Sequence, residues 1–528
     1  MYGAAILTVG VIIMKILGAI YKIPLGNILG DEGYSMFISA YSIYNIFFTL
    51  ATAGLPVALS RLIAEADANG RAGQERRTFK VALVTFAVIG TVFGLIMFLF
   101  PEWLAEKYLE NPDAALSIKA MSPAILLVCL VSAYRGYCQG NGNMIPTTID
   151  EVLEVLFKVI FGLIISVLVL KAGKGLPSAS AGAIFGVTIG GIVSLLFMIF
   201  YKKKNYDTLA APYTGGRDVN DVPEDDELVD PKHKIALNLL KIGIPIALGA
   251  SIMAILNSVD SKLCMNRLQS AAGFSYQQAK VLYGIYGKAQ TLFNLPAALT
   301  QPLNISVVPA IAAAIVLKKK GEADKVSEDS LRITAVVAMP MAAGLAVLSF
   351  PIINLLYPNS HEAGPVLLRT MAVCSFFVCM VLMQNAILQA GGKERLPMYS
   401  MITGSVVKII VNWFLIANPA INILGAPIGT MCGYITMTVM NHIFIRKAAG
   451  IKINVFRIVF RPLMCALIMS AVTALIYKLI PSTPGMLAAM LSAVVVYVAS
   501  VVLLRAITIE DLKLIPGGTK IGKILHMH

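Results

Sequence analysis

The chain has 528 residues, of which 57% are hydrophobic and 14% charged, and its formal net charge is +14. This composition excludes a soluble domain and predicts an all-α polytopic membrane protein. Cations in loops on one side of a membrane explain the basic balance without a nucleic-acid partner. The seven cysteines and five histidines are scattered along the chain, so no disulfide, metal site or cofactor is expected.

Apolar runs of about 18 to 25 residues, bounded by Pro, Gly and charges, predict the transmembrane helices. Fourteen spans are expected, at 4–27, 35–59, 81–100, 121–139, 153–170, 181–200, 242–265, 283–313, 333–356, 366–388, 397–416, 425–445, 462–480 and 486–505. Pro24 and Gly26 are expected to bend the first span near its outer end.

Loop charges predict the orientation of the spans. Alternate loops are basic, among them 61–80, 201–241 and 317–332, whereas 101–117 holds four acidic residues against one lysine. Basic loops face the cytoplasm, so both termini are expected there, in a bacterial plasma membrane. The long polar loop at 205–234 is expected to be a cytoplasmic acidic linker, or alternatively a docking site for a partner.

The two halves of the chain resemble each other. Phe100-Pro101, Val128-Cys129 and Lys158 recur 250 residues later as Phe350-Pro351, Val378-Cys379 and Lys408. Several matches at one offset predict two six-helix repeats, related by a pseudo-two-fold axis along the membrane normal. The expected division is a first lobe at 1–204, the linker at 205–234, a second lobe at 235–448, and two extra helices with a tail at 449–528.

Charged and amide side chains inside apolar helices predict a binding site between the repeats. Lys15 and Lys22 are seven residues apart on one helical face, with Gly18 between them. The first, second, seventh and eighth spans are the expected walls of a net cationic cavity for an anionic substrate. Its candidate residues are Lys15, Lys22, Asn45, Arg61, Asp260, Lys262, Lys288 and Asn294.

A simpler alternative applies to these residues one by one. The cations are then snorkelling or rim charges, Lys15 pairs with Asp260, and the amides hold helices together. Lys158 is expected to lie one layer away, in a structural or gating role, with Glu151 and Glu154 as its partners along the helix.

Three stretches carry a family resemblance: ILGAIYKIPLGNILGDEGYSMF, GLPVALSRLIAEA and YRGYCQGNGNMIP. Because of these stretches and their order over many helices, the chain resembles the MOP exporter superfamily. Within it the chain is similar to the polysaccharide transporter branch, which includes stage V sporulation protein B and Gram-positive lipid II flippases. The resemblance implies that Lys15, Lys22, Arg61 and Lys288 bind a diphosphate. It also implies that the two extra helices line a groove for a polyprenyl tail.

The expected function is therefore a flippase, not an enzyme, for an undecaprenyl-pyrophosphate-linked oligosaccharide, lipid II above all. The chain lacks a P-loop motif, so direct use of ATP is not expected, and a coupling ion, H+ or Na+, is left open. One rival is a MATE-type drug or cation antiporter. Another is a non-transporting scaffold that recruits cell-wall or spore-cortex synthesis proteins through the acidic loop.

Overall fold

The computed structural model describes all residues except 1, 211–228, 302–307, 309–310, 313–319 and 508–528. The described residues form helices and no strands, as expected for an all-α membrane protein. They divide into two compact units, Met1–Asn266 and Arg267–His528.

The first unit contains the helices up to most of α7. They are α1 (Tyr2–Thr52), α2 (Leu55–Ala68), α3 (Ala72–Leu99), the π-helix η1 (Trp103–Tyr108), the 3-10 turn η2 (Pro112–Ala114), α4 (Ala115–Gly140), α5 (Ile145–Lys171), α6 (Gly175–Ala210) and α7 (Lys232–Ser270). Their apolar faces share one buried core, from Tyr21 on α1 to Leu239 on α7.

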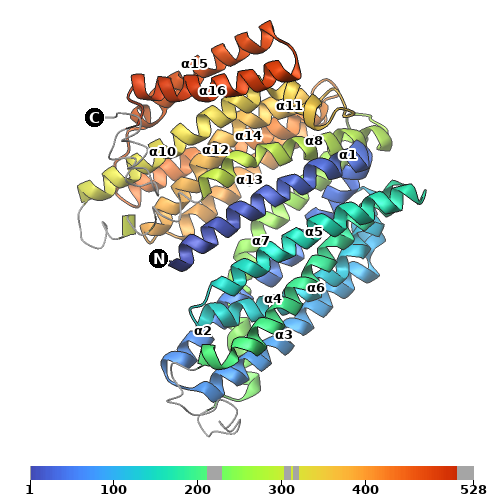
Figure 1. The fold of residues 1–528 in the computed structure, drawn as a ribbon, viewed down its shortest axis with the longest axis vertical. Helices are drawn as coiled ribbons and strands as arrows, with labels where there is room; N and C mark the ends of the chain where they lie inside the picture. Colours follow the sequence, from blue (N-terminus) through green and yellow to red (C-terminus); the bar gives the residue numbers. More distant parts are fainter. Residues whose placement is uncertain (1, 211–228, 302–307, 309–310, 313–319, 508–528) are drawn as a thin grey trace. The chain divides into compact units, whose positions relative to one another are not determined.

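The second unit is also helical in its described residues and ends with a helix pair. Its elements are α8 (Tyr276–Phe293), α10 (Lys320–Val347), α11 (Ser349–Leu356), α12 (Gly364–Ala390), α13 (Arg395–Leu415), the 3-10 turn η4 (Asn422–Leu424), α14 (Gly425–Lys447), α15 (Val455–Leu479) and α16 (Thr483–Leu503). The pair α15 and α16 lies side by side and packs against α10 (Figure 1). The Tyr497 hydroxyl of α16 donates to the Val336 carbonyl of α10 at 2.6 Å.

α1 is a helical hairpin that turns at Gly30. Gly30 has φ 65° and ψ −169°, and the rings of Tyr21 and Phe37 on its two sides lie 5.9 Å apart. In a straight helix these residues would be about 24 Å apart along the axis, so the chain folds back on itself. The turn falls between the first two predicted spans, 4–27 and 35–59, at a residue whose positive φ favours glycine, and Pro24, where a bend of the first span is predicted, lies inside the helix.

Replacing Gly30 by alanine is expected to lower the stability of the folded protein by about 1–3 kcal/mol, because this backbone region is essentially reserved for glycine. Thermal unfolding in detergent measures the change. Nothing lies within 4 Å of the Cβ position at Gly30, so crowding does not contribute. Gly249→Ala, in an equally open position within α7, is the control and is expected to stabilise slightly. Equal losses in both variants would contradict the backbone argument.

Twelve helices in the described part of the chain are long and apolar enough to cross a membrane. Eleven of them correspond one to one to predicted spans. The twelfth, Ile13–Ala68, is 56 residues long and holds the first two spans on either side of Gly30. The predicted span at 283–313 and the linker at 205–234 fall partly outside the described residues, so the total of fourteen stays a prediction.

Two helix pairs pack through glycines that make similar contacts, although the α14 glycines follow those of α6 by 243 residues and not by 250. A Cβ on Gly186 of α6 would lie 2.6 Å from the Gly162 main chain of α5, and Gly190 meets the Glu154 carbonyl. In the second unit, Gly429 of α14 meets Asn412 and Lys408 of α13, and Gly433 meets Gly404 and Lys408. These three α13 residues, Gly404, Lys408 and Asn412, lie 250 residues after Glu154, Lys158 and Gly162. These matching contacts favour the predicted repeat.

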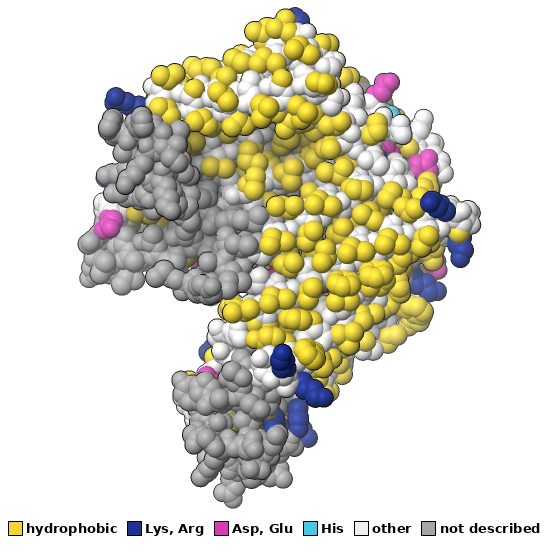
Figure 2. Space-filling model, in the orientation of Figure 1, with side chains coloured by type: hydrophobic (Ala, Val, Ile, Leu, Met, Phe, Trp, Pro, Cys, Tyr) yellow, Lys and Arg dark blue, Asp and Glu magenta, His cyan; other side chains and the backbone are white. Residues whose placement is uncertain are grey.

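The surface of the helices is apolar where a membrane protein meets lipid. On the face drawn in Figure 2, hydrophobic side chains cover the flanks of the helices, and charged ones gather near the edges. Large side chains stand outward on the last helix, with Leu491 72% and Val495 68% exposed. The chain is therefore a multi-pass membrane protein.

Candidate functional site

The cationic face predicted on the first span lies in the first arm of the α1 hairpin. Lys15 is exposed and Lys22 is half-buried. Nothing lies within 4 Å of the Cβ position at Gly18, between them on the same face. This face of α1 therefore has no packed neighbour at Gly18.

A third lysine joins this face from α5. The charge of Lys22 interacts with those of Lys158 and Lys15. α5 lies along α1, and Gly10 of α1 faces Thr148 of α5. Further along α1, the Tyr21 hydroxyl lies beside Gly162 of α5 and donates to the Ala183 carbonyl of α6 at 2.9 Å. The three lysines, which we call the lysine cluster, make no ion pair with a described carboxylate.

Asn45 and Arg61 follow on the second arm of the hairpin and on α2. Both side chains are exposed. Asn45 is eight residues beyond Phe37, so it lies about 12 Å along the second arm from the contact between the Tyr21 and Phe37 rings. Lys15 is six residues before Tyr21, so it lies about 9 Å along the first arm from the same contact. Asn45 is thus at nearly the depth of Lys15. Arg61 lies on α2, beyond the break at Gly54, and the predicted 61–80 loop is formed by the end of α2, a short turn and the start of α3.

Of the two predicted residues on α7, Lys262 lies beside the end of η1. Asp260 is buried, and the Lys262 ammonium lies 5.6 Å from the Tyr108 ring centroid. One turn further, the Asn266 amide donates to the Glu110 carboxylate at 2.7 Å. These contacts fasten the end of α7 to the first unit.

The two predicted residues of α8 belong to the second unit. Lys288 is 1% exposed, donates to the Ser360 hydroxyl at 2.8 Å and lies 5.2 Å from the Tyr357 ring centroid. Asn294 is exposed, and its amide donates to the Gln290 carbonyl at the end of the helix. Lys288 therefore contacts the segment between α11 and α12 inside its own unit.

Sequence reasoning missed a cluster of charges around Arg135 of α4. The guanidinium lies 2.5 Å from Asp150, 2.8 Å from Glu154 and 3.7 Å from Glu151, all on α5. Ser194 of α6 donates to the other Asp150 oxygen. The Asp150 side chain is fully buried, and that of Arg135 is 11% exposed.

This Arg135 cluster corrects the expected partners of Lys158. Glu151 and Glu154 bind the guanidinium of the neighbouring helix, not the lysine on their own helix. A guanidinium offers five donors in a rigid fork and holds several carboxylates at once, which an ammonium on a flexible chain does less well. The signal was available, since Arg135 lies inside an apolar span and Asp150 lies four residues before Glu154.

Long apolar helices with a group of unpaired cations inside them define a membrane transporter rather than a soluble or surface-bound protein. A profile of the family described as "Polysaccharide biosynthesis protein" matches residues 1–315, and a MatE profile matches residues 284–414. The first match covers more than half of the chain, so the chain belongs to the polysaccharide biosynthesis protein family.

Relatives from Bacillus subtilis (strain 168) span almost the whole chain. The uncharacterized membrane protein YabM is 27% identical, over 99% of this chain and 96% of its own. Lipid II flippase MurJ is 24% identical, over 95% and 92%, and stage V sporulation protein B is 23% identical, over 97% and 97%.

The fold has a close counterpart among solved structures. The inward closed conformation of lipid II flippase MurJ matches with a TM-score of 0.67 at 15% identity, over 96% of this chain and 99% of that one. The predicted membership of the polysaccharide transporter branch of the MOP superfamily is confirmed. The names of the characterised relatives agree with the expectation of a transporter and not an enzyme.

Proposed function

We propose that this protein is a flippase for an undecaprenyl-pyrophosphate-linked oligosaccharide, lipid II above all, across a bacterial plasma membrane. The observation that carries the proposal is the lysine cluster on the open face of α1. Three like charges inside apolar helices repel one another unless an anion joins them. A diphosphate supplies that anion, and its sugars cannot cross hydrocarbon unaided. The relative named lipid II flippase supports this choice of substrate.

The proposed cycle moves the headgroup from the cytoplasmic to the outer leaflet by alternating access, with both termini in the cytoplasm. The membrane potential favours outward movement of an anion by roughly 2.3 kcal/mol per charge per 100 mV. The polyprenyl tail stays in lipid along α15 and α16, whose outward side chains are apolar. The cavity between the repeats, the roles of Asp260, Lys262, Lys288 and Asn294 in it, and an H+ or Na+ coupling ion stay predictions.

Replacing Lys15 by glutamine is expected to slow the flipping of fluorescent lipid II in proteoliposomes about tenfold, because one charge-assisted contact to phosphate is lost. Access of a quencher to the label measures the rate. Lys171→Gln, an exposed lysine at the end of α5, removes the same charge outside the cluster and should flip at the wild-type rate. Equal rates in all three proteins would move the headgroup site away from α1.

A MATE-type cation exporter is the second candidate, favoured by the MatE profile and by the three carboxylates around Arg135. Uptake of a lipophilic cation into the same proteoliposomes separates the two functions. Cation uptake without lipid II movement would replace the flippase proposal. The scaffold alternative predicts instead that removal of 218–230 abolishes the cellular phenotype while transport is unchanged.

A further inference from the structure

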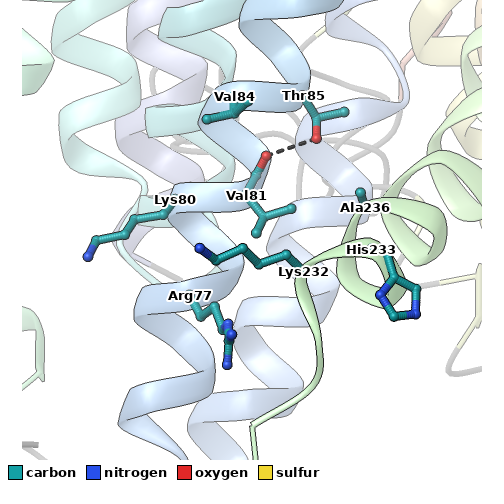
Figure 3. A pocket seen from close by; sticks show the side chains of 8 residues that line it. All are labelled: Arg77, Lys80, Val81, Val84, Thr85, Lys232, His233 and Ala236. Atoms are coloured by element: carbon teal, nitrogen blue, oxygen red, sulfur yellow. Dashed lines mark hydrogen bonds between the residues drawn. The ribbon is translucent and has the colours of Figure 1, made fainter. Parts of the chain in front are cut away.

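A basic pocket of about 480 Å³ lies where the start of α7 meets α3 in the first unit (Figure 3). It is lined by Arg77, Lys80, Val81, Val84, Thr85, Lys232, His233 and Ala236. None of these residues belongs to the lysine cluster or to the Arg135 cluster. The pocket therefore needs an explanation of its own.

The pocket is held in shape by contacts between the two helix starts. The Gln74 side chain accepts a hydrogen bond from the Asp230 backbone N–H at 2.8 Å. Ile235 and Leu239, on the inner face of α7, are buried in the core of the unit. The start of α7, which carries Lys232 and His233, is thus held beside α3.

The charges of the lining select an anion. Three cations and a histidine line the pocket, and none of its lining residues is acidic. The nearby carboxylate of Asp230 pairs with Lys234 at 2.6 Å, outside the lining. In Figure 3 the Lys232 side chain extends toward α3, where Arg77 lies one turn before Val81.

An apolar stripe continues from this pocket along α3. Val84, Val88 and Val92 follow Lys80 at steps of four residues, and they are 64%, 58% and 48% exposed. Side chains four apart share one face of a helix, and α3 is long and apolar enough to span a membrane. A cationic pocket at the end of such a stripe matches a phospholipid, with its phosphate in the pocket and its acyl chain on the valines.

We propose that this pocket binds the headgroup of an anionic phospholipid, with Arg77 and Lys232 on its phosphate. In the predicted orientation the 61–80 loop is cytoplasmic, and that leaflet supplies anionic lipid. A soluble phosphate compound would need the cations but not the exposed valines. The lipid thus accounts for both halves of the surface.

Native mass spectrometry of the full chain, purified in detergent and supplied with dioleoylphosphatidylglycerol or dioleoylphosphatidylcholine, tests the proposal. Wild type should retain the phosphatidylglycerol preferentially. Arg77→Gln with Lys232→Gln should retain about tenfold less of it, because two charges near the phosphate are lost. Lys203→Gln with Lys204→Gln is the control: these lysines are exposed at the same end of the unit, where neighbouring Lys202 lies 3.3 Å from the Phe79 ring centroid.

Three results would overturn the proposal. The first is that the two double variants retain equal amounts of phosphatidylglycerol while melting at the wild-type temperature. The second is that glycerol 3-phosphate displaces the lipid at equal concentration, which would assign the pocket to a soluble anion. The third is that the protein binds the lipid only after removal of 218–227, which would assign the pocket to the acidic segment of the chain itself.

Discussion

Replacing Lys22 by glutamate is expected to reduce lipid II flipping by about tenfold to a hundredfold. Lys22 is half-buried, so its contact with a phosphate is little weakened by water. A carboxylate at this position would pair with Lys15 and Lys158, which interact with Lys22 in the wild type, and would repel the diphosphate. Losing one desolvated charged hydrogen bond costs about 1.5–3 kcal/mol, which sets the range. Initial rates in proteoliposomes measure the effect.

Two variants control this experiment. Lys22→Arg keeps the charge and should keep most of the rate. Lys171→Glu makes the same charge reversal at the exposed end of α5 and should leave the rate unchanged. If Lys22→Glu flips lipid II at the wild-type rate, the lysine cluster does not hold the headgroup, although the fold assignment would survive.

Removing the guanidinium of the Arg135 cluster is expected to lower the stability of the protein strongly. Arg135→Ala is expected to destabilise the protein by about 3–5 kcal/mol, because it leaves uncompensated carboxylates in a buried site. Asp150 is affected most, since its side chain is fully buried. The loss appears as a lower melting temperature in detergent and a lower yield of monodisperse protein.

The second unit provides the matched control. Asn385, 250 residues after Arg135, accepts a hydrogen bond from the Asn441 amide at 2.8 Å. Asn385→Ala removes a neutral contact and should destabilise by only about 1 kcal/mol. Combining Arg135→Asn with Asp150→Asn and Glu154→Gln should recover most of the stability lost in Arg135→Ala. A triple variant as unstable as the single one would show that packing, not charge, holds this site.

The sequence was most informative where a local pattern decides the structure. Hydropathy predicts eleven of the described spanning helices one to one, because span length is set by the bilayer. Helical periodicity places Lys15 and Lys22 on one open face, with Gly18 between them. The sharp turn within α1 lies between the first two predicted spans, and Gly30, whose φ is positive, makes it.

Contacts between helices account for what the sequence did not show. Glu154 and Lys158 are four residues apart, so a local rule pairs them, but Arg135 on another helix is the partner that forms. The sequence predicts Lys158 one layer away from the cavity, because nothing in its own helix indicates that α1 lies alongside. Lys288 has the same pattern of a lysine in an apolar helix, yet it is enclosed by Ser360 and Tyr357.

The glycine contacts between α5 and α6 have a consequence for how the two predicted repeats can diverge. At Gly186 and Gly190 any added side chain meets the neighbouring main chain, so these sites accept almost no other residue. The second unit has glycines with similar contacts on α14, Gly429 and Gly433, but it has Asn385 250 residues after Arg135. In an ancestral duplication, helix spacing would then be the inherited constraint. The charged residues would be the part left free to acquire separate tasks in each copy.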